Sequence, residues 1–128
     1  LEKDKQHIHK LMVMGESMLI DGLYNHLVNQ FTGKINIYRS KDTYIEITPA
    51  NVNKASGCLI LLNYLGLKPE QALAFGDNFN DIEMLQMVSF GVAMDNAPLA
   101  VKGKAKMVAP ANIEDGVAKT LEDIFKFV

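Results

Sequence analysis

Two aspartates four residues apart follow a short apolar run and are the first candidates for chemistry. The run Ala72–Phe75 is followed by Gly76-Asp77-Asn78-Phe79-Asn80-Asp81. Gly76 lets the backbone turn, so Asp77 lies directly beyond the run and Asp81 enters the next helix. Carboxylate oxygens suit a hard cation such as Mg²⁺, which also retains several waters. The same two residues suit a helix N-terminus, which stabilises negative charge, so the spacing leaves both interpretations open.

Lys54 is the second candidate, because it lies at the start of a predicted helix, where a cation is disfavoured. Its neighbours Asn51, Asn53 and Ser56 are polar. A lysine at this end is explained if an anion such as phosphate lies before the helix, bound by the ammonium and by free backbone N–H groups. The alternative is a solvated surface lysine, and the residues alone leave it open.

The residues before Pro49 predict elements in the order β-α-β-β. Ile8–Met14 alternates like a strand, and Glu16–Phe31 repeats apolar residues every four positions like a helix. Lys34–Arg39 and Thr43–Ile47 carry β-branched and aromatic residues, and the short polar connector between them predicts an antiparallel hairpin. Proline disfavours helix at the residue before it and closes the strand, so we place a boundary between residues 48 and 49.

After Pro49 the pattern changes to helices that alternate with short apolar strands. The expected helices are Asn53–Leu65, Asp81–Met87, Ala97–Gly103 and Ile113–Phe127, and the expected strands are Ala72–Phe75, Phe90–Met94 and Lys106–Ala109. In the first of these helices we expect Leu59, Leu62 and Leu65 to face inward. Such alternation predicts parallel strands with helices on the faces of the sheet. The fold class is therefore α/β, and ligands are expected beyond the carboxyl ends of its strands.

Composition excludes several classes of protein. The 128 residues have a net charge of -2, with 48% hydrophobic and 22% charged residues, which is typical of a globular domain. A near-neutral charge argues against a dedicated nucleic-acid binder, and no apolar run approaches the ~20 residues needed to cross a membrane. The single cysteine, Cys58, excludes an internal disulfide and favours a cytoplasmic location. Leu1 is not an initiator methionine, so we expect the chain to begin partway through a longer product.

One resemblance covers nearly the whole chain and depends on four stretches and one lysine: Glu46–Pro49, Lys54, Ala74–Leu85, Gly91–Ala97 and Glu114–Val117. Their order and spacing resemble the C-terminal part of Cof-type phosphatases of the haloacid dehalogenase-like (HAD) hydrolase superfamily. The stretch Gly-Asp-x-x-Asn-Asp is specific when Val-Ala-Met-x-Asn-Ala accompanies it downstream. By this resemblance, residues 1–48 are the end of an α/β cap domain, and residues 49–128 are the C-terminal half of a Rossmann-like, doubly wound, mostly parallel core.

The resemblance also implies an activity, namely Mg²⁺-dependent hydrolysis of phosphate monoesters through an aspartyl-phosphate intermediate. The substrate would be a small phosphorylated metabolite similar to a sugar phosphate. Lys54 would neutralise the phosphate and steady the nucleophilic carboxylate, and Asn80 would hydrogen-bond near the phosphate. Asp77 would be a Mg²⁺ ligand, and Asp81 would bind the metal or orient its water. The chain departs from the family pattern around Lys54, where Ala55 replaces a glycine, and at Asp95, which also replaces a glycine.

The largest departure is that the sequence contains no Asp-x-Asp, the motif that carries the family's nucleophile. We therefore predict that this chain alone is inactive. Without the nucleophile's strand, the Ala72–Phe75 strand would have an unpaired edge, which favours self-association. The alternative function is a non-catalytic module that binds a partner protein through this half-sheet, and a phosphotransferase acting at the same site is a third option.

Overall fold

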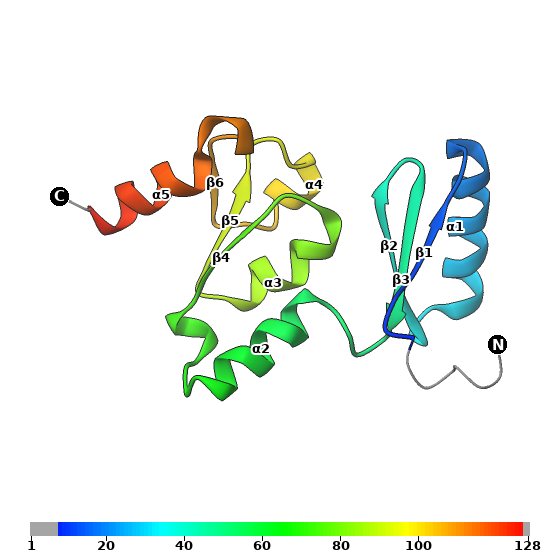
Figure 1. Ribbon diagram of the computed structural model, residues 1–128, viewed down its shortest axis with the longest axis horizontal. Coiled ribbons are helices and arrows are strands. Elements are labelled where there is room, and N and C mark those ends of the chain that lie inside the picture. The colour runs from blue at the N-terminus through cyan, green and yellow to red at the C-terminus, as the bar shows by residue number, and fades with distance from the viewer. Residues whose placement is uncertain (1–7, 127–128) are drawn as a thin grey trace. The chain divides into compact units, whose positions relative to one another are not determined.

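A computed structural model describes residues 8–126 of the chain (Figure 1). Two compact units divide between Asn53 and Lys54, five residues beyond the boundary expected from Pro49. The segment before this division is held to the first unit, because the Asn36 side chain donates to the carbonyl oxygens of Pro49, Ala50 and Val52 at 3.0–3.2 Å. The assignment of the two units to a cap and a core stays a prediction.

The first unit has the predicted β-α-β-β order. Its elements are β1 (Leu11–Met14), α1 (Ser17–Phe31), β2 (Ile35–Lys41) and β3 (Tyr44–Pro49). The strands form one antiparallel sheet in the order β1-β3-β2, so the predicted β2–β3 hairpin is confirmed. Helix α1 lies along one face of this sheet, and Ile20 of the helix and Ile45 of β3 are the fully buried side chains of this unit among residues 8–53. Apolar residues spaced along one side of a helix thus supply the core of this unit.

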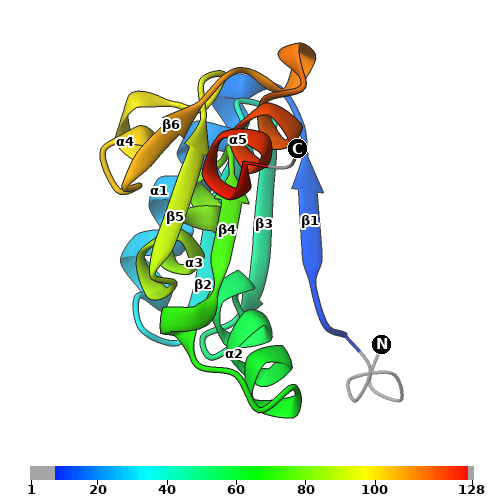
Figure 2. The same cartoon turned by 90° about the vertical axis from the view of Figure 1, so that its left-hand side faces the viewer.

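The second unit alternates helices and strands, as predicted. Its helices are α2 (Lys54–Tyr64), α3 (Ile82–Met87), α4 (Leu99–Lys102) and α5 (Gly116–Phe125), and its strands are β4 (Leu73–Gly76), β5 (Phe90–Met94) and β6 (Met107–Ala109). Short 3₁₀ turns are η1 (Pro69–Gln71), η2 (Phe79–Asp81) and η3 (Asn112–Glu114). The strands form a parallel sheet in the order β4-β5-β6, and Figure 2 shows β4 and β5 running the same way. The α/β fold class is confirmed.

The core of the second unit lies on both faces of β5. Ala93 packs with Leu85 and Val101 on the face covered by α3 and α4. Val92 and Met94 pack with Ala109 on the opposite face. The uninterrupted apolar sequence of β5 is therefore explained by burial on both sides. Strand β4 pairs only with β5 among residues 8–126, so its other edge is unpaired there.

Helix α2 corrects one expectation from the sequence. Of the three leucines expected to face inward only Leu62 is buried, while Leu59 is 40% exposed and Leu65 is 56% exposed. The helix itself is apolar on every side, because Cys58–Leu62 is a continuous apolar run. Helix α3 and the η2 turn contact α2, and Leu62 is the one buried residue of the helix. The apolar run therefore cannot be buried on every side by this unit.

The last helix is shorter than expected because the backbone changes conformation at Asp115. The predicted helix Ile113–Phe127 is divided into η3 and α5 by Asp115, which has a left-handed backbone conformation (φ 56°). A left-handed residue interrupts a right-handed helix, and aspartate tolerates this conformation better than most residues. Phe127 lies outside the described residues. No helix between residues 8 and 126 is both long and apolar enough to cross a membrane.

Gly91 and Gly57 give a matched test of the packing in the second unit. A Cβ at Gly91 would lie 2.0 Å from the carbonyl oxygen of Leu85, so Gly91→Ala should lower the free energy of unfolding by about 1–3 kcal/mol. A Cβ at Gly57, in α2, would meet nothing within 4 Å, so Gly57→Ala should raise it by about 0.5–1 kcal/mol. Urea unfolding followed through NMR signals of β5 measures both changes. Equal effects of the two substitutions would contradict this packing.

Candidate active site

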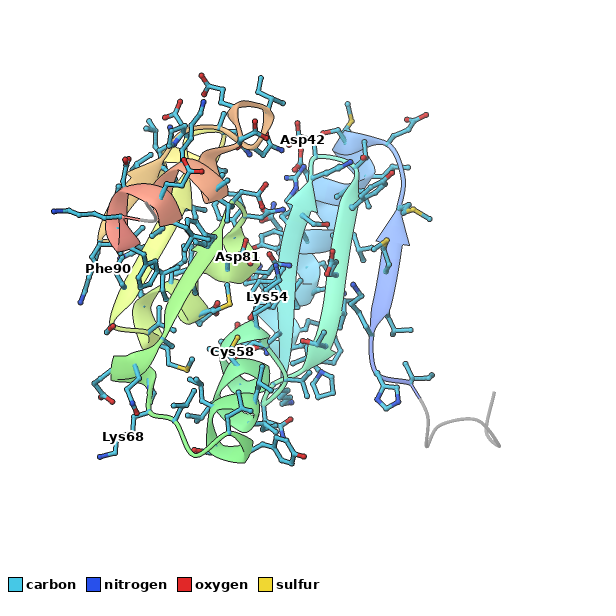
Figure 3. All side chains as sticks on the ribbon, turned by 60° about the vertical axis from the view of Figure 1, so that its left-hand side comes forward. Asp42, Lys54, Cys58, Lys68, Asp81 and Phe90 are labelled. Atoms are coloured by element: carbon cyan, nitrogen blue, oxygen red, sulfur yellow. The ribbon has the colours of Figure 1, made fainter. Side chains whose placement is uncertain are left out.

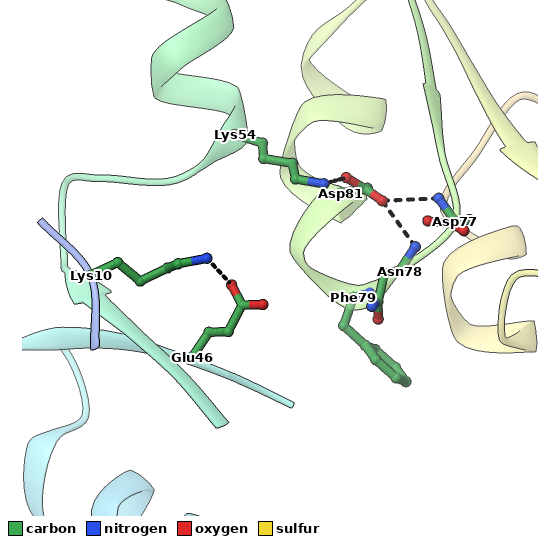
Figure 4. A network of polar contacts seen from close by, with 7 residues as sticks. All are labelled: Lys10, Glu46, Lys54, Asp77, Asn78, Phe79 and Asp81. Atoms are coloured by element: carbon green, nitrogen blue, oxygen red, sulfur yellow. Dashed lines mark hydrogen bonds and ion pairs between the residues drawn. The ribbon is translucent and has the colours of Figure 1, made fainter. Parts of the chain in front are cut away.

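The buried carboxylate of Asp81 organises the loop that follows β4. Asp81 is 2% exposed, at the end of η2. Its Oδ2 accepts hydrogen bonds from the backbone N–H groups of Asp77 and Asn78, each at 2.9 Å (Figure 4). A Cβ at Gly76 would lie 2.5 Å from the Cβ of Asp81, so this close approach requires glycine at the end of the strand. The Gly-Asp-x-x-Asn-Asp spacing is thus explained by a loop whose last residue, Asp81, hydrogen-bonds to the backbone of its first residues.

Lys54 reaches the same carboxylate from the first turn of α2. Its Nζ donates to Oδ1 of Asp81, and the two groups form an ion pair although they are 27 residues apart in sequence (Figures 3 and 4). The Asp81 side chain is 3% exposed, whereas the Lys54 side chain is 49% exposed. An ammonium group has three donors, and Asp81 is its one partner among residues 8–126. The Lys54 ammonium is therefore still partly exposed to solvent.

Asp77 lies beside this ion pair with an exposed side chain. Its Oδ2 accepts a hydrogen bond of 3.2 Å from Nδ2 of Asn96, which follows β5. Oδ1 of Asn96 accepts in turn from the backbone N–H of Asn112, which follows β6, at 3.1 Å. The three residues come from loops at the carboxyl ends of three parallel strands, which meet at one edge of the sheet. Sequence reasoning did not select Asn96, although its position just after β5 is a usable signal.

Asn80 occupies the middle of η2 and is half-buried. Its Oδ1 is buried and has no hydrogen-bond partner within the described part of the chain. Buried polar atoms of this kind are uncommon in folded proteins, because leaving one unpaired is unfavourable. Asn80 is thus one side chain of the loop with unused hydrogen-bonding capacity.

The four residues selected from sequence all belong to the second unit, three of them on the loop after β4. Lys54 contacts Asp81 directly, and Asp81 contacts the backbone of Asp77. Their geometry therefore does not depend on where the first unit lies. The catalytic, metal-binding and substrate-binding roles of Lys54, Asp77, Asn80 and Asp81 stay predictions.

Comparison with known proteins identifies the family. Residues 1–121 match the sequence model of the family described as haloacid dehalogenase-like hydrolase. The chain belongs to this family. The resemblance to Cof-type members of the HAD superfamily that the sequence motifs indicated is thereby confirmed.

Relatives with described names match this HAD-family chain along most of its length. 5-amino-6-(5-phospho-D-ribitylamino)uracil phosphatase YcsE of Bacillus subtilis is 34% identical over 115 residues, which are 88% of this chain and 46% of the relative. A haloacid dehalogenase-like hydrolase from Bacteroides thetaiotaomicron is 34% identical with a TM-score of 0.74, covering 91% of this chain and 44% of the other. The HAD subclass IIB sugar phosphatase BT4131 has a TM-score of 0.83 at 23% identity, covering 98% and 46%, and it supports the fold alone. The chain spans less than half the length of each of these relatives.

The carboxylates of this HAD-family site suit Mg²⁺, which keeps several waters, better than they suit a metal ion that needs all its ligands from protein side chains. No cluster of three or more His, Cys, Asp or Glu residues between residues 8 and 126 could hold a metal ion. Magnesium is commonly bound through one or two carboxylates together with waters and substrate oxygens. Both oxygens of Asp81 already accept hydrogen bonds, whereas Oδ1 of Asp77 has no partner in the described region. Asp77 is therefore the carboxylate better able to bind the cation directly.

Substitutions at Asp81 should separate its backbone contacts from its ion pair. Asp81→Ala removes the acceptor for two backbone N–H groups and should lower the free energy of unfolding of the second unit by about 2–3 kcal/mol. Asp81→Asn keeps an acceptor oxygen of the same size and should have a smaller effect. Lys54→Met leaves the buried Asp81 carboxylate without its counter-charge but with both backbone hydrogen bonds, so it should lower the stability by less, about 1–2 kcal/mol.

Urea unfolding of the three variants, followed by NMR as for Gly91→Ala, measures the order of these effects. A loss from Lys54→Met that equals the loss from Asp81→Ala would contradict the dominant role assigned to the backbone hydrogen bonds.

Proposed function

We propose that this chain supplies part of the active site of a Mg²⁺-dependent phosphatase that hydrolyses small phosphorylated metabolites. The single observation that carries this proposal is the contact between the Lys54 ammonium and the buried Asp81 carboxylate beyond the carboxyl end of β4. A phosphoryl group in transfer requires cations at its oxygens and accurate positioning. An ammonium held by a buried carboxylate, next to an exposed carboxylate that can bind a cation, meets both requirements.

Lys54 binds the phosphate in this proposal, and Asp81 orients Lys54. The ammonium is held by Asp81 on one side and is half exposed on the other, so it can donate to a phosphate oxygen without leaving its partner. Because Lys54 is the first residue of α2, backbone N–H groups of the first helical turn lie near its main chain. These groups favour an anion at the same place.

Asp77 and Asn80 complete the part of the site that this chain provides. When bound, Mg²⁺ supplies positive charge to the phosphate oxygens and to the developing charge of the leaving group. Asp77 would hold the ion through its unpartnered oxygen, and Asp81 would bind the metal or orient one of its waters. Asn80 can donate through its Nδ2 to a phosphate oxygen, and its buried Oδ1 can accept from a hydroxyl or a water.

The attacking carboxylate in this proposal lies outside the 128 residues, because the sequence contains no Asp-x-Asp. That carboxylate would form a bond to phosphorus while the ester P–O bond breaks, and the leaving alkoxide would take a proton from solvent water, which the hydrolysis step returns. Water would then hydrolyse the acyl phosphate to inorganic phosphate and restore the carboxylate. Lys54 neutralises charge on the phosphate oxygens in both steps.

The substrate class proposed here is a phosphate monoester of a sugar or sugar-like chain. The relative YcsE is named for a substrate whose phosphate is carried by a ribityl chain attached to a uracil ring. That relative is 34% identical over a region that contains all four candidate residues. A polyol phosphate of this type is therefore the first substrate to test.

The 128-residue chain by itself should release no p-nitrophenol from p-nitrophenyl phosphate in the presence of Mg²⁺, because it lacks an attacking carboxylate. Measurable turnover above buffer would contradict this expectation. If the reading frame upstream encodes Asp-x-Asp-x-Thr, the longer protein should hydrolyse the same ester. In that protein Lys54→Met should lower kcat/KM about 100-fold or more, because a donor to the transition state is removed.

Lys119→Met is the matched control for Lys54→Met in the longer protein. Lys119 lies on α5 with an exposed side chain that makes no hydrogen bond or ion pair among residues 8–126. It should leave kcat/KM unchanged. Equal losses from both substitutions, or no loss from either, would remove Lys54 from the active site and the phosphatase proposal with it.

A second candidate function is a non-catalytic module that binds a partner protein or a second copy of the chain. The observation that favours it is the unpaired edge of β4 within the described residues, together with the exposed apolar side chains of α2. Such an edge is able to pair with another strand. An upstream reading frame without Asp-x-Asp-x-Thr, combined with concentration-dependent dimerisation in analytical ultracentrifugation, would favour this module over the enzyme.

A further inference from the structure

Asn96 connects the loops that follow all three strands of the parallel sheet. Its Nδ2 donates to Oδ2 of Asp77 at 3.2 Å, and its Oδ1 accepts from the backbone N–H of Asn112 at 3.1 Å. Asp77 follows β4, Asn96 follows β5, and Asn112 begins the η3 turn that follows β6. One side-chain amide therefore joins three segments that are separated by 16 to 19 residues in sequence.

The two contacts of Asn96 have a fixed direction. An asparagine amide has one acceptor end and one donor end. Because Oδ1 is engaged by the Asn112 N–H, the donor end is turned toward Asp77. The Asn112 N–H lies at the start of η3, where backbone donors have no partner within the turn itself. Each contact thus satisfies a group that the local backbone leaves available.

This geometry restrains a carboxylate that is otherwise exposed. Asp77 has an exposed side chain, and its Oδ2 has Asn96 as its one partner in the described region. Without that contact the carboxylate could change its side-chain rotamer more freely, since no other hydrogen bond holds it within residues 8–126. With the contact, Oδ2 is held by Asn96, and Oδ1 has no hydrogen-bond partner in the described region.

We propose that Asn96 is the positioning residue that orients the Asp77 carboxylate toward its cation, and that the Asn112 N–H orients Asn96. This inference is based on the proposed function, since it assigns Asp77 to the metal. Asn96 itself touches neither metal nor substrate. Hydrogen-bonded partners of a ligating carboxylate fix its orientation, and their removal typically weakens metal binding about 10- to 100-fold.

Three variants of the 128-residue chain test the proposal through Mg²⁺ affinity, which requires no turnover. Asn96→Ala removes the whole bridge. Asn112→Pro keeps Asn96 but removes the backbone N–H that orients it. Residue 112 is the first position of a helical turn, where proline is well tolerated. Ala111 has an extended backbone (φ -60°, ψ 160°), as a residue before proline requires. Asn112→Ala is the matched control, because it changes the same side chain and keeps the N–H.

Mg²⁺ titrations followed by the amide NMR signals of residues 76–81 give the dissociation constants, and thermal unfolding checks that each variant is folded. Asn96→Ala should weaken Mg²⁺ binding about 10-fold, at the lower end of the range for such partners, because Asp77 is exposed. Asn112→Pro should weaken it about 3-fold, in keeping with the loss of one neutral hydrogen bond. Asn112→Ala should match the wild-type chain. A role confined to loop stability would lower the unfolding temperature and leave the Mg²⁺ affinity of the folded protein unchanged.

The outcomes separate this inference from the proposed function. If the wild-type chain binds Mg²⁺ and Asn96→Ala binds it with the same affinity, the inference is overturned and the metal site is not. A weakened Asn96→Ala with an unchanged Asn112→Pro would overturn the part assigned to the Asn112 N–H. No shift of residues 76–81 by Mg²⁺ in the wild-type chain would overturn the metal site and the inference together.

Discussion

The arrangement of the site depends on one buried negative charge. A carboxylate removed from water is strongly unfavourable unless hydrogen bonds and an opposite charge replace its hydration. Asp81 is 2% exposed, and it meets this requirement with two backbone N–H groups and the ammonium of Lys54. The same contacts close the loop after β4 and bring the start of α2 next to that loop. Satisfying one charge therefore assembles groups that are far apart in sequence.

The parallel sheet determines which other residues can join this site. Strands that run the same way present their carboxyl ends at one edge, so the loops after β4, β5 and β6 converge there. Asp77, Asn96 and Asn112 are neighbours for this reason, and the hydrogen bonds between them need no special backbone conformation. Glycine is required where the approach is closest, at Gly76, because Asp81 occupies the space of a side chain. Topology and packing together specify the spacing of the motif.

The sequence was sufficient to predict the order of the elements, the parallel pairing and the antiparallel hairpin, because hydrophobic periodicity and proline positions carry that information. It was also sufficient to select Lys54, which the structure brings to Asp81. It was insufficient at Leu59 and Leu65, since an all-round apolar helix does not reveal which side is covered. Asp115 was missed because a single left-handed residue leaves no periodic signal. Asn96 was missed because its partners lie in loops that follow other strands.

The exposed apolar surface of α2 and the absence of an Asp-x-Asp motif from the sequence can be explained together. Apolar side chains of α2 that stay in contact with water contribute no burial energy to folding. An unpaired strand edge leaves backbone groups without hydrogen-bond partners. Both features occur in the second unit, on α2 and β4, the elements that carry Lys54 and lead into Asp77. A further strand beside β4 would pair its edge and would present its own carboxyl end next to these residues, provided that it ran parallel to β4. A carboxylate at the end of such a strand would lie next to Lys54 and Asp77, where the proposed function places the attacking group.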